Sequence, residues 1–394
     1  MAPVVIDRTE QRELYHAAEA VVEAHSEVAA LCRARPDLLS RTFDLPPAHR
    51  AMWEAGGPDW HGVARADVFR TADGLQVCEL NSDTPSGQPE AVALGRAFGG
   101  DAISAPAHDP NRGLERRIAG LLHRAASRVA ARCGFAPDDP RARQIGIVYP
   151  TDLTDELCLV ELYARWFEAC GFSVVLGSPY NLRPDGDGGV SLFGVSCAVI
   201  WRNYKTDWWG ERRRIWRSAP EVLDTEPLTE PLSLLLEASA RGRCAVINPF
   251  GAVVTQNKRA MALMWEEMGE LSPEAQRAIR RYVPYTVRLE SLSPRRLRAE
   301  REQWVLKSDY GSEGEEVIVG AHVSDRAWNF ALADACHGRW IAQRRFRPVA
   351  LDGDLVPNYG VYVVAGRACG LYTRLARGAT DRRALSVASL VRLP

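Results

Sequence analysis

The sequence predicts an α/β protein, and three observations indicate this class. Residues 9–34 and 114–129 place apolar side chains at helical spacing. Between residues 145 and 176, a short apolar run, a helical stretch and a second apolar run follow one another, which predicts a parallel β-α-β unit. From residue 304 onward short strands and turns dominate, with one helix near 325–336, so the C-terminal part has α+β character.

The boundaries of the first elements come from local signals. The first helix is expected to end before Pro36, and the second at Gly134, which suits a left-handed cap. Residues 145–149 and 172–176 are the predicted strands on either side of a helix over 154–170. These elements predict the start of a parallel sheet.

Further elements continue this sheet and then leave it. The apolar runs 198–201 and 244–247 are expected to be strands of the same sheet, which gives a doubly wound subdomain over residues 136–254. Two helices, 256–268 and 273–283, follow, and Ser272 with a proline after it is a typical start for the second.

Length and composition limit the classes of function. A chain of 394 residues is long enough for two or three domains. Lys plus Arg number 49 and Asp plus Glu number 50, so the net charge of -1 gives no attraction to nucleic acid. The nine cysteines are scattered without a Cys-x-x-Cys pair, and no apolar run approaches the ~20 residues of a membrane helix. We therefore expect a cytoplasmic protein that binds neither nucleic acid nor membranes; the oligomeric state is not predicted.

Lysine is rare in this chain. Only Lys205, Lys258 and Lys307 occur beside 46 arginines. A lysine kept in such a background can mark a place where a compact ammonium group is needed. Codon bias with three accidental survivors explains the count equally well.

A hairpin in the first third of the chain collects polar side chains. If residues 72–74 form a three-residue loop, Asp67 lies opposite Glu79 and Arg65 opposite Asn81, all on one face. A two-residue loop would shift the register and split this set. Facing carboxylates repel unless a positive charge lies between them, and a divalent cation such as Mg²⁺ suits these oxygen ligands. A solvated hairpin face is the alternative.

The second half contains residues suited to phosphate binding. Lys307 ends a strand and leads into a short loop with Gly311 and Gly314, so an ammonium group and backbone N–H groups can meet phosphate oxygens. Lys258 lies at a helix start, which also favours an anion. The segment 201–209, rich in aromatic and charged residues, fits either a substrate lip or a partly buried turn.

These motifs resemble the synthetase domain of the glutathionylspermidine synthase family, a circularly permuted branch of the ATP-grasp ligases. The resemblance starts with Arg65-x-Asp67, followed by Glu79-x-Asn81-Ser-Asp-Thr-Pro85. Matches in the family's order continue to the C-terminus: Asn248-Pro, Asn257-Lys258, Trp304-Val-Leu-Lys307, Tyr310-Gly311-x-x-Gly314, Trp340-Ile-Ala-Gln343, Gly370-Leu-Tyr-Thr-Arg374 and Thr380.

The resemblance implies a role for each matched residue. Asp67, Glu79 and Asn81 would hold Mg²⁺ on ATP. Arg65 would contact the transferred γ-phosphoryl group, and Arg374 would clamp that group or the substrate carboxylate. The other implied ATP contacts are Lys258 and Lys307 on the α and β phosphates, the covering loop with Tyr310, Gly311, Ser312 and Gly314, and Gln343 at adenine.

The implied fold is a circularly permuted ATP-grasp with a Rossmann-like pre-ATP-grasp subdomain. Residues 1–135 would supply N-terminal helices and the metal-site hairpin, 136–254 the Rossmann-like subdomain, and 255–394 the nucleotide-binding lobe. The chain departs from the family's usual Lys-Pro and loop arginine at Ser308-Asp309 and Ser312-Glu313, and Asp309 is expected to place a negative charge near the phosphates.

The implied activity is an ATP-dependent carboxylate–amine ligase that forms an amide through an acyl phosphate. Its cofactors would be ATP and Mg²⁺, and its substrates a small-molecule or peptide carboxylate and an amine, whose identities the residues do not specify. Two alternatives remain: an ATP-binding regulatory or accessory protein without ligase activity, and a kinase that stops at a phosphorylated product.

Overall fold

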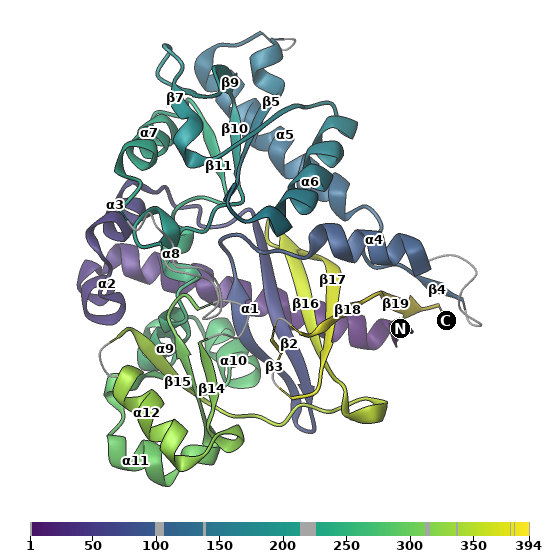
Figure 1. Ribbon diagram of the computed structural model, residues 1–394, viewed down its shortest axis with the longest axis vertical. Helices are drawn as coiled ribbons and strands as arrows, with labels where there is room; N and C mark the ends of the chain where they lie inside the picture. The colour runs from purple at the N-terminus through teal and green to yellow at the C-terminus, as the bar shows by residue number, and fades with distance from the viewer. Residues whose placement is uncertain are drawn as a thin grey trace.

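The α/β class predicted from the sequence is confirmed by the computed structural model (Figure 1). Figure 1 shows a parallel sheet at the top, a small antiparallel sheet at the lower left, and a larger sheet in the middle. The structure describes residues 2–98, 106–136, 139–212, 226–311, 316–335, 338–378, 380–381 and 383–393.

The larger sheet joins the two ends of the chain. Its order is β18-β17-β16-β2-β3, with antiparallel neighbours throughout. The hairpin β2–β3 from the first third therefore pairs through β2 with the C-terminal hairpin β16–β17. The strands are β2 Val63–Thr71, β3 Gly74–Asn81, β16 Val356–Val364, β17 Arg367–Ala376 and β18 Leu385–Val387.

The long helix α1 (Arg8–Ala34) packs against this sheet and buries its apolar stripe there. Asp7 caps the helix through a capping box with Glu10, which satisfies backbone N–H groups of the first turn. Just before it, β1 (Val4–Ile6) pairs in parallel with β19 (Ser389–Arg392), whose other neighbour is β4 (Ala107–His108). The N- and C-terminal segments thus lie side by side.

The parallel sheet has the order β11-β10-β5-β6, and all four strands fall where the sequence predicted them. Its strands are β5 Gln144–Val148, β6 Ser173–Gly177, β10 Val199–Arg202 and β11 Ala245–Ile247. The helices packed around it are α5 Leu114–Cys133, α6 Leu157–Ala169 and α7 Thr229–Ala240. A further small sheet, which the sequence did not predict, consists of β7 Leu182–Pro184, β8 Val190–Leu192 and β9 Val195–Cys197.

The small antiparallel sheet has the order β12-β15-β13-β14 and its own apolar core around Trp304 and Trp328. Its strands are β12 Thr286–Arg288, β13 Trp304–Ser308, β14 Val317–Val319 and β15 Trp340–Arg344. The remaining helices are α2 Pro36–Phe43, α3 Pro47–Ala55, α4 Gln88–Phe98, α8 Ala252–Thr255, α9 Arg259–Glu266, α10 Pro273–Tyr282, α11 Pro294–Ala299 and α12 Asp325–Ala335. Within the described ranges, no helix combines the length and apolarity needed to cross a bilayer.

Candidate active site

The hairpin β2–β3 brings its four polar side chains together, but not by the turn that the sequence suggested. Thr71 pairs with Gly74, so the loop has two residues, and the three-residue loop was wrong. Gly74 has φ of +126°, a conformation that favours glycine. This loop alone would have shifted the register. A β-bulge between Asp67 and Val68 inserts one extra residue, Cys78, and restores it.

Beyond the bulge, the pairing is the predicted one: Asp67 faces Glu79, and Arg65 faces Asn81. The amide of Asn81, oriented to satisfy its neighbours, donates to Glu79 Oε1 at 2.9 Å and accepts from Arg65 Nη2 at 3.2 Å. Arg65 Nε donates to Asp67 Oδ1 at 2.8 Å. Four side chains from two strands therefore form one connected polar surface.

Arg374 extends this surface from the other side. It lies on β17, two strands away from β2, and its Nη2 donates to Asp67 Oδ2 at 2.6 Å. The intervening strand β16 places Gly360 beside Asp67. A Cβ at Gly360 would lie 2.7 Å from Arg65 Cδ, so a side chain there would collide with the arginine. The missing side chain leaves room for Arg65 over the sheet.

Opposite charges keep the buried groups ionised. Burial alone would lower the pKa of Arg65, but the adjacent Asp67 carboxylate holds that pKa above its ordinary value. Burial alone would raise the pKa of Asp67, but Arg65 and Arg374 hold it well below its usual range. Asp67 is therefore a carboxylate at neutral pH.

The two lysines expected at phosphates both reach the hairpin. Lys307 Nζ donates to the carbonyl oxygen of Cys78 at 2.9 Å, so the bulged residue supplies its anchor. Lys258 Nζ donates to the carbonyl oxygen of Gly311 at 2.6 Å and lies 3.8 Å from Glu79 Oε2. Both lysines are almost fully buried. A buried ammonium group is a compact cation that can pair with an anion.

One cavity of about 1000 Å³ connects most of the predicted residues. Predicted site residues in its lining are Arg65, Asp67, Glu79, Asn81, Lys307, Gln343 and Arg374. Lys258 and Gly311 are not among the residues of this lining. Gln343 is buried, and its amide donates to Thr286 Oγ1 at 3.0 Å, which fixes the side chain. Ser312 and Gly314 lie outside the described residues.

Tyr310 and Asp309 face away from this cavity. The Tyr310 hydroxyl donates to the backbone carbonyl of Val253, and its ring packs edge-on against His49. Asp309 accepts from Arg339 Nε at 2.6 Å and lies outside the cavity lining. The expected negative charge near the phosphates is therefore compensated by an arginine and directed elsewhere. The side chain of Tyr310 does not cover the cavity.

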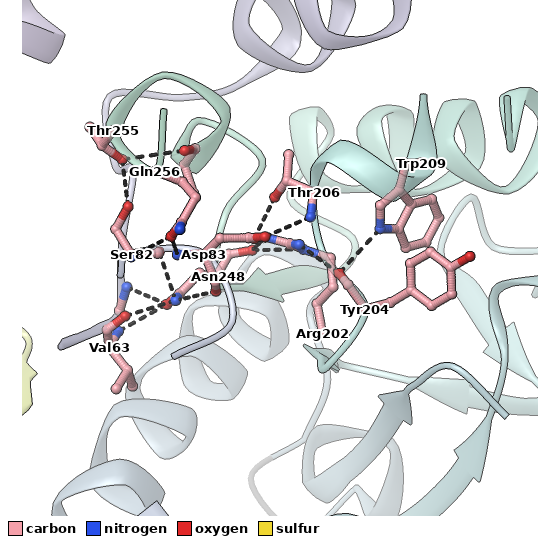
Figure 2. A network of polar contacts seen from close by, with 12 residues as sticks. Val63, Ser82, Asp83, Arg202, Tyr204, Thr206, Trp209, Asn248, Thr255 and Gln256 are labelled. Carbon is pink, nitrogen blue, oxygen red and sulfur yellow. Dashed lines mark hydrogen bonds and ion pairs between the residues drawn. The ribbon is translucent and has the colours of Figure 1, made fainter. Parts of the chain in front are cut away.

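A buried network just beyond Asn81 was given no role from the sequence (Figure 2). Asn248 Nδ2 donates to the carbonyl oxygens of Val63 at 2.8 Å, Ser82 at 2.9 Å and Asp83 at 2.6 Å. Its Oδ1 accepts from the backbone N–H groups of Gly62 at 2.7 Å and Val63 at 2.9 Å. One side chain thus ties the start of β2 to the end of β3.

The same network holds Asp83 by its carboxylate. Asp83 forms a fully buried ion pair with Arg202 and accepts from the backbone N–H of Thr206 at 2.6 Å. Gln256 Oε1 accepts from the N–H groups of Ser82 at 2.8 Å and Asp83 at 3.0 Å. The parallel sheet therefore fixes the residues that follow Asn81. The motifs containing Asp83 and Asn248 were visible in the sequence, but their contacts depend on tertiary structure.

The cavity continues past the hairpin to a wall that includes part of segment 201–209, for which the sequence left a substrate lip and a partly buried turn open. Glu90 on α4, Glu156 before α6, and Asn203, Lys205 and Trp208 after β10 line this wall. Residues 344–348, at the end of β15 and after it, also line the cavity and include three arginines. The cavity thus has one end at the hairpin, where the cations suit phosphate binding, and a second end of mixed charge.

The donor set fits a magnesium ion that arrives with phosphates. The described part of the chain holds no group of three His, Cys, Asp or Glu side chains placed to bind a metal alone. Glu79 and Asn81 are joined by a hydrogen bond and line the cavity beside Asp67, giving two carboxylates and an amide. Mg²⁺ typically takes one or two protein carboxylates and completes its shell with substrate phosphates and water.

Comparisons with known proteins agree with this fold. Residues 221–391 match the family model described as glutathionylspermidine synthase preATP-grasp, which confirms the resemblance over that stretch. A glutathione synthetase-like effector from Globodera pallida, in its apo form, superposes with a TM-score of 0.59 at 12% identity, covering 98% of this chain and 88% of that one.

A second solved structure has a similar fold. It is a putative gamma-glutamylcysteine synthetase from Methylobacillus flagellatus KT, with a TM-score of 0.50 at 15% identity, covering 98% of this chain and 89% of that one. Identities this low establish the fold alone. A comparison with curated proteins gives no match.

Proposed function

We propose that this protein is an ATP-dependent carboxylate–amine ligase that forms an amide through an acyl phosphate. The observation that carries the proposal is the convergence of Arg65, Asp67, Glu79 and Arg374 with Lys307 on one cavity. These residues come from three regions of the chain, and isolated ion pairs rarely gather in a cavity for stability alone. The family match and the synthetase fold support the same class.

The charge of the site supports binding of a magnesium nucleotide. Around the hairpin alone, the four cations Arg65, Lys258, Lys307 and Arg374 outnumber the carboxylates Asp67 and Glu79 by two. Mg-bound ATP carries a charge of about -2, so it balances this excess. A metal ion without phosphates would add to it, so we expect metal and nucleotide to bind together.

Each residue has a role in this proposal. Asp67, Glu79 and Asn81 hold Mg²⁺, which neutralises charge on the phosphates when bound. Lys307 and Lys258 contact the α and β phosphates, and Gln343 contacts adenine. Residues 255–394 supply the nucleotide lobe, 136–254 the Rossmann-like subdomain, and 1–135 the hairpin.

Arg65 and Arg374 provide the positioning of the reacting groups. Their guanidinium groups converge on Asp67 from two strands, which fixes both planes before substrate binds. The carboxylate oxygen of the acid attacks the γ-phosphorus, and the bond to ADP breaks. The substrate ammonium loses one proton to solvent, and the resulting amine nitrogen attacks the acyl carbon. The attacking nitrogen then loses a second proton, and inorganic phosphate leaves as the amide forms. Fixed cations stabilise the charge that spreads over the transferred oxygens.

An ADP-release screen tests the proposal. Pooled carboxylates are incubated with the protein, MgATP and hydroxylamine, which converts an acyl phosphate to a hydroxamate. The proposal requires hydroxamate formation that depends on the acid and is lost in Arg65→Met. ADP release with an acceptor but no hydroxamate indicates a kinase. Nucleotide binding without any turnover indicates a regulatory protein, and either result contradicts the ligase.

A further inference from the structure

The second end of the cavity combines charges of both signs, and three elements contribute to it. Glu90 lies in the first turn of α4, Glu156 directly before α6, and Asn203 and Lys205 in the loop after β10. This loop follows the carboxyl end of a parallel strand, where open α/β sheets place their ligands.

The chain after β10 alternates between the buried network and the cavity. Arg202 is fully buried and bonds Asp83 and the carbonyl oxygen of Tyr204, and Tyr204 is buried as well. Asn203 and Lys205, the residues between and after them, line the cavity instead. Buried and cavity-lining side chains therefore alternate over residues 202–205.

Glu90 and Glu156 form the acidic side of this wall. Asn203 Nδ2 donates to Glu156 Oε2 at 3.3 Å. Within the residues that the structure describes, Oε2 of Glu90 is buried and has no hydrogen-bond partner. Glu156 and Arg65 are both close enough to Glu90 to affect its titration. A cation stabilises neighbouring carboxylates, and the interaction of Arg65 with Glu90 links this acidic side to the hairpin end.

The basic side is a single ammonium group with loose contacts. Lys205 Nζ lies 3.6 Å from Asp207 Oδ2 and 3.4 Å from the carbonyl oxygen of Tyr310, both long for a charge-assisted bond. It also lies 5.3 Å from the ring centre of Trp208, which lines the cavity too. A ligand carboxylate there would give this ammonium a shorter partner.

We propose that this wall binds a zwitterionic amino-carboxylate as the amine substrate, with its ammonium group at Glu90 and Glu156 and its carboxylate at Lys205. The inference rests on the proposed ligase function and names the class of its amine. The ammonium end lies on the Arg65 side, where the acyl group is activated, and the carboxylate end points away from it. A diamine would bring a second positive charge to Lys205, which repels it.

Calorimetric binding of matched probes tests this assignment. The full-length protein, saturated with Mg²⁺ and a non-hydrolysable ATP analogue, is titrated with ω-amino acids from glycine to 6-aminohexanoate, and with diamines and monocarboxylates of the same lengths. We expect one amino acid to bind at least ~10-fold tighter than its matched diamine and monocarboxylate. A diamine that binds more tightly than every amino acid overturns the inference.

Variants separate recognition from folding. Lys205→Met should weaken amino acid binding at least ~10-fold without weakening the diamine, while Lys205→Arg restores most of it. Glu156→Gln should weaken both amines. The matched control Arg128→Met removes an exposed cation on α5, away from the cavity, and should change nothing. Unchanged amino acid binding in a folded Lys205→Met protein also overturns the inference.

These titrations are independent of turnover. If amino acid binding depends on Lys205 but the trap experiment gives no hydroxamate, the ligase proposal is contradicted and the amino acid pocket is supported. Hydroxamate formation without selective amino acid binding contradicts the pocket alone.

Discussion

The two ends of the cavity are built differently. At the hairpin end, Arg65, Asp67 and Arg374 hold one another through hydrogen bonds of 2.6 to 2.8 Å. At the far end, Lys205 has only long contacts and Glu90 keeps one oxygen without a partner among the described residues. The hairpin end is suited to stabilising a transition state, which requires fixed charges. The far end is suited to a ligand that completes its contacts on binding.

The largest effect is expected at the hairpin end. Glu79→Ala should reduce turnover at least ~1000-fold, because the variant loses a metal ligand that no neighbour replaces. Its thermal unfolding should change little, since Glu79 faces the cavity and is partly exposed. The control Glu237→Ala removes an exposed acid on α7 and should keep full activity. Wild-type turnover in Glu79→Ala would remove the metal assignment.

The network of Figure 2 should show as stability and not as binding at either end. Asp83→Ala leaves Arg202 buried without a counter-ion, which should cost about 3–5 kcal/mol of unfolding free energy. Urea denaturation measures this loss. The double variant with Arg202→Met should recover part of it, because the orphaned charge is gone. If Asp83→Ala is as stable as the wild type, the Asp83–Arg202 ion pair does not hold the end of β3.

Acid should affect the two ends at different pH. Burial is the main cause that raises the pKa of Glu90, whereas Arg65 and Arg374 keep the pKa of Asp67 low. As the pH falls, Glu90 takes up its proton first and loses its attraction for an ammonium group. The charged or titratable groups that interact with Glu90 are Arg65, Glu156, Tyr163, Tyr362 and Tyr372.

Amino acid affinity should therefore fall as the pH is lowered from neutral, over the range in which the probe itself stays zwitterionic. In Glu90→Gln the affinity should already be low and nearly independent of pH. The same calorimetric titrations measure both proteins. An equally steep pH dependence in the variant would exclude Glu90 as the responsible group.

The smallest effect is expected for Cys78. Lys307 is held by the carbonyl oxygen of this residue, so the thiol itself is dispensable. Burial raises the pKa of the thiol to about 11, so it remains protonated at neutral pH. Cys78→Ala should retain turnover within about threefold in the same ADP-release assay. A loss comparable to that of Glu79→Ala would mean that the side chain takes part in binding.

The sequence predicted the pairing within the hairpin better than it predicted the sheet that carries the hairpin. Periodicity located the parallel strands, and the spacing of Asp67 and Glu79 gave their pairing correctly. The predicted reason for that pairing, a three-residue loop, was wrong. The loop has two residues, and the bulge at Cys78 restores the register that the shorter loop would have shifted. Single-residue effects of this kind depend on tertiary contacts, here the anchoring of Lys307 to the bulge.

Contacts between distant segments were beyond the sequence argument. No local sequence pattern predicts the pairing of β16 with β2 or the five hydrogen bonds of the Asn248 side chain. The partners in both cases lie far apart in the chain. The direction of Asp309 was likewise undetermined, because Arg339 reaches it from another strand end. The rarity of lysine was a signal for Lys205, but segment 201–209 is too irregular for the sequence to show which of its residues face inward.

Calorimetric titration of ATP, with Mg²⁺ or with EDTA, into the wild type, Glu79→Gln and Lys307→Met tests the nucleotide site most directly. The wild type should bind ATP at least ~10-fold more tightly with Mg²⁺ than without it. Glu79→Gln should lose this difference, and Lys307→Met should bind weakly in both conditions. Equal affinities in all three proteins would contradict the account, because ATP would then bind away from the β2–β3 hairpin.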